Sequence, residues 1–145
     1  MVESIRLIIL SFLASFGFGV VFHLIGKDLL WAGLSGALTR CMYLILLSFV
    51  DNRLVCVMLA AMLAALYAEI LATNKKMPST VFLYPAIVPL IPGDLFLYTV
   101  TNLVMEEFEM ALSNGKDCIL TLSCMSIGFV ISSTIAYYIR RHRLG

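Results

Sequence analysis

Charged side chains are scarce in this chain of 145 residues: Asp, Glu, Lys and Arg make up 13% of it, against about a quarter in soluble domains. The formal net charge of +1 leaves no basic surface for nucleic acid and no acidic tail. Apolar residues make up 61%, and the mean hydropathy is +1.00. The composition therefore argues against a nucleic-acid-binding protein and indicates a protein embedded in the lipid bilayer.

Residues that usually carry catalysis or bind metals are also few. The two histidines, His23 and His142, belong to no HExxH motif, no GxSxG turn is present, and nothing resembles a Walker A loop. The four cysteines lie in apolar stretches and form no CxxC pair. The sequence thus predicts no catalytic residue, no metal site and no cofactor, and it argues against an enzyme or an ATP-driven pump.

Long apolar runs fill the chain instead. Because a bilayer span needs roughly 20 apolar residues, five such runs use almost the whole length and leave one transmembrane domain, 1–145, with little room for a soluble one. The first run is too long for a cleaved signal peptide and is expected to be retained. The sequence therefore predicts an all-α membrane protein of about five helices, at approximately residues 4–25, 29–50, 54–73, 80–105 and 118–139.

Lys and Arg in the short loops predict which side of the membrane each loop faces, because cytoplasmic loops carry more of them. Five crossings with a cytoplasmic C-terminus put six inside and three outside, which favours an outside N-terminus in a multi-pass protein of the cell membrane. A re-entrant fourth run would flip the first three runs and gives a weaker bias of five against four. The expected inside residues are Lys27, Lys75, Lys76, Arg140, Arg141 and Arg143, and the outside ones are Arg6, Arg53 and Lys116.

Small residues form stripes along the predicted helices. Alanines recur every four residues from Ala60 to Ala72, and Gly33, Gly36 and Arg40 share one face of the second run. In lipid, helices associate through close packing of such faces. The stripes fit packing within the chain, docking to another membrane subunit, or a homo-oligomer, and the pattern alone leaves these open.

Three ionisable side chains fall well within the apolar runs, where a charge costs at least about 2.5–3.5 kcal/mol near the bilayer centre. Arg40 and Asp94 both fall near mid-depth, so we expect them to pair inside the bundle. Glu69 lies near the end of its run, where it can reach the interface or pair with Lys75 or Lys76. Asp94 and Glu69 are the candidates for carrying a coupling proton, because apolar surroundings favour the neutral carboxylic acid.

The stretch YPAIVPLIPGD, residues 84–94, interrupts the fourth run with three prolines and a glycine. Each proline lacks an N–H and clashes with the carbonyl four residues earlier, so we expect two half-helices, the second capped by Asp94. Such a break survives in a bilayer only where it is buried in protein or lines a cavity. It predicts either a kinked structural helix or a substrate path. The candidate path residues are Pro85, Pro89, Pro92, Gly93, Asp94, Arg40 and Tyr98.

The string PAIVPLIPGD, followed by an apolar half-helix with Tyr98, resembles the threonine/serine exporter family. It is similar to the short integral-membrane component, whose proline-rich PLxPG segment would be Pro89 to Gly93 here. The resemblance implies a proton-driven secondary transporter that exports threonine or serine together with a separate, larger membrane subunit. Two departures, Ala86 in place of an expected glycine and Asp94 where no acid is fixed, leave the substrate and the role of Asp94 open.

Two alternatives also stay open. An assembly or scaffold subunit without a transport path fits the alanine stripes and the short loops equally well. The cargo could also be a dicarboxylate such as succinate, which the resemblance associates with some relatives. All three readings imply the lipid bilayer and a larger membrane subunit as partners, and the two transport readings add a small-molecule substrate.

Overall fold

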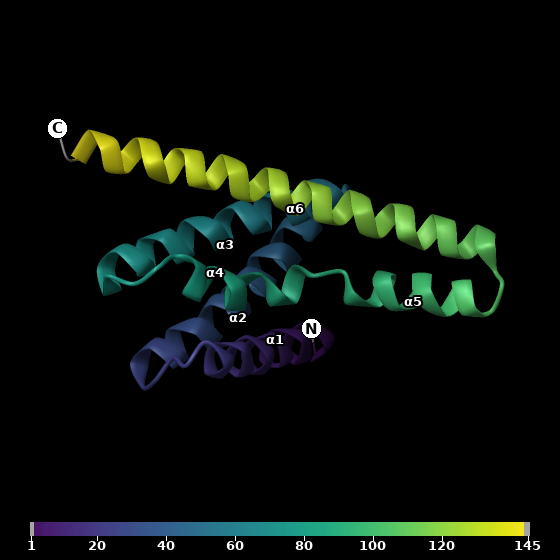
Figure 1. The fold of residues 1–145 in the computed structure, drawn as a ribbon, viewed down its shortest axis with the longest axis horizontal. Coiled ribbons are helices and arrows are strands. Elements are labelled where there is room, and N and C mark those ends of the chain that lie inside the picture. The colour runs from purple at the N-terminus through teal and green to yellow at the C-terminus, as the bar shows by residue number, and fades with distance from the viewer. Residues whose placement is uncertain (1, 144–145) are drawn as a thin grey trace.

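The structure is a computed structural model that describes the backbone of residues 2–143 and the side chains of residues 2–139. Every element in the described part is helical, which confirms the predicted all-α fold. Figure 1 shows the helices in space. They are α1 (Val2–Val21), α2 (Lys27–Phe49), α3 (Arg53–Lys75), α4 (Thr80–Ile87), the 3-10 helix η1 (Val88–Leu90), α5 (Gly93–Val104) and α6 (Phe108–Arg143).

Four of these helices are long and apolar enough to cross a membrane: α1, α2, α3 and the Phe108–Ile139 part of α6. The fourth apolar run forms a bent pair, Thr80–Leu90 and Gly93–Val104, whose two parts meet at 59°. The predicted break in this run is therefore confirmed, and the chain is a multi-pass membrane protein. Four spans result if the bent pair is re-entrant, and five if it crosses.

The last helix begins earlier than the sequence predicted. Residues 108–117, which precede the predicted helix at 118–139, are the first turns of α6, and a short turn after Val104 joins α6 to α5. In that turn Glu106 has a positive φ of 61°, and the Glu107 N–H donates to the Asn102 carbonyl over 2.8 Å. The early start has a packing reason: Gly115 lets α6 lie so close to α5 that a Cβ there would meet Thr99 at 3.3 Å.

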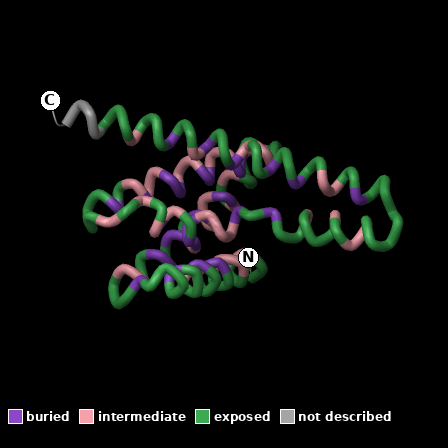
Figure 2. The backbone as a smooth tube through the Cα atoms, viewed as in Figure 1, coloured by how far each residue is buried: buried purple, intermediate pink, exposed green. Residues whose placement is uncertain are grey.

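Glycines and alanines permit the closest helix contacts. Gly36 of α2 packs on Ser15 of α1, where an added methyl group would overlap the serine side chain. Gly128 of α6 packs on the backbone of α3 near Met58. The predicted alanine stripe of α3, from Ala60 to Ala72, is buried within the chain, as the purple segments of Figure 2 indicate.

α5 and the N-terminal half of α6 form a helical hairpin that continues past the ends of α1, α2 and α3 (Figure 1). None of the residues of α5 is buried, whereas Phe82, Pro85 and Ala86 of α4 are fully buried between α1, α2 and α3. The fourth run thus has one half inside the bundle and one half outside it, with the Pro–Gly break at the exit.

Candidate functional site

The break is formed by a short irregular segment between η1 and α5. Ile91 has extended angles (φ −61°, ψ 123°), and the Gly93 N–H donates to the Ile91 carbonyl over 2.8 Å as the next helix begins. Pro85 remains inside α4, and Val88 keeps helical angles. Pro85 therefore does not break the helix, although the sequence counted it among the three prolines that interrupt this run. Pro89 lies in the first turn of η1, where a proline is tolerated, and Pro92 ends the helical path.

The side chain of Arg40 reaches this break from α2. Its Nη1 donates to the Pro89 carbonyl oxygen at 3.4 Å, and its guanidinium carbon lies 5.4 Å from the centre of the Tyr43 ring, a cation–π arrangement. Its Nε is buried without a hydrogen-bond partner. Since a guanidinium has five N–H donors, Arg40 retains donors that an anion could use.

The predicted ion pair between Arg40 and Asp94 does not form between these two described residues. The salt bridge that the structure contains in the described region joins Lys75 to Asp28 over 2.9 Å, across the ends of α3 and α2. The predicted cap is also wrong, because α5 already begins at Gly93 with Pro92 in the N-cap position. The exposed Asp94 carboxylate lies in the first turn instead, where the positive end of the helix dipole favours a negative charge.

Arg40 and Asp94 nevertheless line one cleft of about 370 Å³, which we call the Arg40 cleft. Its volume is within the range of small-molecule pockets in proteins. The walls hold two guanidinium groups, one carboxylate, a phenol and a hydroxyl group, which gives it both signs of charge. It is lined by residues 89–94 of the break and by Arg40, Tyr43, Arg53, Val57 and Thr121.

The structure brings together five of the predicted path residues, Arg40, Pro89, Pro92, Gly93 and Asp94. The other two lie elsewhere. Pro85 is buried inside α4, and Tyr98 is exposed on α5, because α5 leaves the bundle directly after the break.

Sequence reasoning missed Tyr43, Arg53 and Thr121 as members of the cleft. Arg53 counted only as a loop charge, yet it is the first residue of α3, directly after the N-cap Asn52. Its position at the start of a helix beside the break was the available signal. No signal in the sequence pointed to Thr121, because only the packing of α6 beside the other walls brings this residue to the Arg40 cleft.

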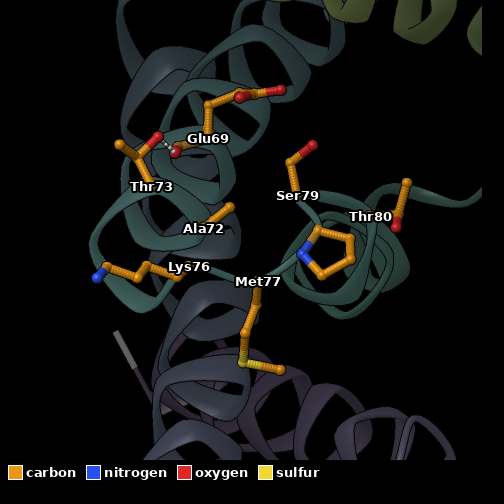
Figure 3. Close-up of a pocket in the computed structure, with 8 residues that line it drawn as sticks. Glu69, Ala72, Thr73, Lys76, Met77, Ser79 and Thr80 are labelled. Carbon is orange, nitrogen blue, oxygen red and sulfur yellow. Dashed lines mark hydrogen bonds between the residues drawn. The ribbon is translucent and has the colours of Figure 1, made fainter.

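A second cleft of about 490 Å³ lies at the opposite end of α4 (Figure 3). We call it the Glu69 cleft. One wall is the last turns of α3, with Glu69, Ala72 and Thr73, and the other is residues 76–80. The Thr73 hydroxyl donates to the Glu69 carbonyl over 2.8 Å, and the Glu69 side chain extends from α3 toward the segment that carries Ser79 (Figure 3).

Comparison with known proteins gives one family. The family described as "Threonine/Serine exporter, ThrE" has a model that matches residues 7–135, a range that includes part of every helix and both clefts. No curated protein and no solved structure matches the chain. The matched family is one of transporters and not of enzymes.

Proposed function

The chain belongs to the threonine/serine exporter family, and we propose that it is the small membrane subunit of a secondary transporter that exports threonine or serine. One observation carries this proposal beyond the family: a cleft with a guanidinium and a carboxylate opens where the fourth apolar run breaks. Broken helices of this kind form substrate sites in secondary transporters.

The charges of the Arg40 cleft match a zwitterionic amino acid. The free guanidinium donors of Arg40 suit the α-carboxylate, because charge-assisted bonds of this type are among the strongest in proteins. Asp94 suits the α-ammonium group, and the hydroxyls of Tyr43 and Thr121 are available to the side-chain hydroxyl of threonine or serine. Arg40 and Asp94 line the same cleft without forming an ion pair with each other, so a substrate would not have to break one between them.

Helix lengths support a site near one membrane face. At 1.5 Å per residue, the 36 residues of α6 measure about 54 Å, against a hydrocarbon core of about 30 Å. The polar residues 113–117 divide α6, and residues 118–139 alone would measure about 33 Å. On this placement Thr121 lies about one turn inside the membrane surface. The Arg40 cleft then lies near that surface. The sequence had predicted a position at mid-depth for Arg40 and Asp94.

We assign this face to the outside, with the N-terminus outside and the C-terminus in the cytoplasm, in keeping with the positive-inside bias of the sequence. Export then moves the substrate toward the Arg40 cleft. We further propose that the proton motive force drives export and that Asp94 or Glu69 carries the coupling proton. Both side chains line clefts, where water and substrate can reach them.

The hairpin of α5 and α6 supports a separate larger subunit as partner. Val104, Phe108 and Leu112 are 65–79% exposed at the far end of this hairpin, although this part of the chain would lie beyond the membrane surface set by residues 113–117. Apolar side chains exposed to water at this density mark an interaction site. We therefore propose that the larger subunit covers this hairpin.

An efflux assay tests the transport proposal. Cells that co-express the chain and its larger subunit are loaded with labelled L-threonine, and its release is followed for Arg40→Gln and Asp94→Asn. Loss of a hydrogen bond to a charged group costs about 1.5–3 kcal/mol, so each variant should lower efflux at sub-saturating substrate about 10-fold to 100-fold. The matched controls Arg6→Gln and Glu109→Gln remove exposed charges outside both clefts and should export normally. Full export by both cleft variants would refute the mechanism.

Arg53 favours a second candidate, export of a dicarboxylate. With Arg40 it gives the cleft two guanidinium groups, which could each bind one carboxylate. Two variants distinguish the candidate substrates. Asp94→Asn should impair export of an amino acid, whereas a dicarboxylate exporter should tolerate Asp94→Asn and lose activity in Arg53→Gln.

A scaffold role without a path predicts a different result. A cysteine at Ile91, which lines the Arg40 cleft, should react with an aqueous thiol reagent on a transport path, and its reaction should slow when L-threonine is added. A cysteine at Ile87, which packs against the core, is the control. No reaction at Ile91, or a reaction there that L-threonine does not slow, would favour the scaffold.

A further inference from the structure

The Glu69 cleft has the chemistry of a second substrate site. It lies at the start of α4, whereas the Arg40 cleft lies just after η1, so the two clefts flank the eleven residues of α4 and η1. Those residues measure about 16 Å as a helix. Along α3, Glu69 follows Arg53 by sixteen residues, or about 24 Å. The two clefts therefore lie at opposite ends of the α4–η1 segment.

The walls of the Glu69 cleft carry groups of complementary kinds. α3 supplies the half-buried carboxylate of Glu69, and the opposite wall supplies the hydroxyls of Ser79 and Thr80. The Ser79 side chain occupies the N-cap position of α4 but makes no capping hydrogen bond, which leaves its hydroxyl for a ligand. Lys76 lines the rim and points away from Ser79 (Figure 3).

We propose that the Glu69 cleft is a second binding site for a small zwitterionic amino acid, at the membrane face opposite the Arg40 cleft. The α-ammonium group lies against the Glu69 carboxylate, and the α-carboxylate accepts hydrogen bonds from the Ser79 and Thr80 hydroxyls. This inference rests on the proposed export function and adds to it the cytoplasmic end of the path. The barrier between the two sites is α4, whose Phe82, Pro85 and Ala86 are fully buried.

Both clefts are open in the same structure, so both sites can be filled at once. Equilibrium binding of labelled L-threonine to the full chain in lipid nanodiscs should therefore saturate at two molecules per chain. Glu69→Gln and Asp94→Asn should each reduce this to one, and the double variant should bind none. The control Glu109→Gln removes an exposed carboxylate outside both clefts and should keep both sites.

The outcomes separate the two proposals. A single molecule per chain that is lost in Asp94→Asn but kept in Glu69→Gln overturns the second site and leaves the proposed function intact. Binding that is absent from the wild-type chain, or unchanged in Asp94→Asn, overturns the proposed function.

A second measurement covers the case in which Glu69→Gln does not fold. A cysteine introduced at Pro78, an exposed residue that lines the Glu69 cleft without being one of the proposed ligands, is the reporter. It should be alkylated about tenfold more slowly at an L-threonine concentration about ten times the dissociation constant, as the one-site factor 1 + [L]/Kd requires. Lys27→Cys, exposed at the same end of the bundle but outside the Glu69 cleft, should react at an unchanged rate. Protection of Pro78→Cys should persist when Asp94→Asn is added, and lack of protection in Pro78→Cys alone would overturn the second site.

Discussion

Gly128→Ala should separate two helices that now touch through their backbones. A Cβ at this position would lie 2.5 Å from the Met58 carbonyl oxygen, 3.2 Å from the Met62 nitrogen and 3.3 Å from the Ala61 Cβ. Two of these three atoms belong to the α3 backbone, which cannot rotate away as a flexible side chain can. The two helices must therefore move apart to admit one methyl group.

The required shift can be worked out from the contact distances. Carbon–oxygen contacts between helices are normally about 3.3–3.6 Å long, so relief of the 2.5 Å contact moves α6 from α3 by roughly 1 Å. Overpacking of this kind costs about 1–3 kcal/mol. The loss falls on the contact between α3 and α6, one of the main helix contacts of the fold, and the lipid supplies no hydrophobic force to restore it.

The measurement is the free energy of unfolding in mixed micelles, followed by circular dichroism as denaturing detergent is added. Gly17→Ala is the matched control, because that glycine lies in α1 with nothing within 4 Å of an added Cβ. Alanine is the better helix former by about 1 kcal/mol, so the control should be neutral or slightly stabilising. Equal stabilities of the two variants would refute the packing assigned to Gly128.

Three further results are expected. Gly36→Ala should also destabilise the protein by about 1–3 kcal/mol. Adding Ser15→Gly should recover most of this loss, because the added methyl group clashes with the Ser15 side chain. Thermal melts of the single and double variants test this, and a double variant as unstable as Gly36→Ala would contradict it. Asn52→Ala should cost about 1 kcal/mol of unfolding free energy, because its side chain caps α3 by accepting from the N–H of the second and third helix residues, whereas Asn52→Asp should cost little. Asp28→Asn and Lys75→Gln should show a coupling of at most about 1 kcal/mol in a double-mutant cycle, because a part-exposed pair is screened by solvent; a larger coupling would show that the pair is more buried than its accessibility indicates.

The fold was predictable as far as it depends on local chemistry. Apolar runs of bilayer length identified α1, α2 and α3, and the alanine stripe identified the packed face of α3. The start of α6 was missed because it depends on contact with α5: Gly115 permits that contact, but a glycine in a polar stretch looks like a loop residue until its neighbour is known.

The site was predictable in part for the same reason. Prolines act on their own backbone, so the break at Pro92 and Gly93 could be read from the sequence, and Arg40 was rightly expected beside it. Its partner could not be read, because the carbonyl of Pro89 lies 49 positions away along the chain. The depth argument paired Arg40 with Asp94 on the assumption that the fourth run is centred in the membrane, whereas α5 leaves the bundle after the break.

The position of the two clefts shows which part of the bundle has to move for a substrate to pass. α1 and α2 are held together at Gly36, and α3 and α6 at Gly128, by contacts too close for sliding without loss of packing. α4 is a single eight-residue helix, and Pro92 interrupts the backbone hydrogen bonds that would otherwise continue it. Gly93 has nothing within 4 Å of a Cβ position, so no neighbouring helix packs closely against the break at this residue. A short element with a loosely packed break at one end needs less rearrangement than the long helices around it, and we therefore expect alternating access to involve α4.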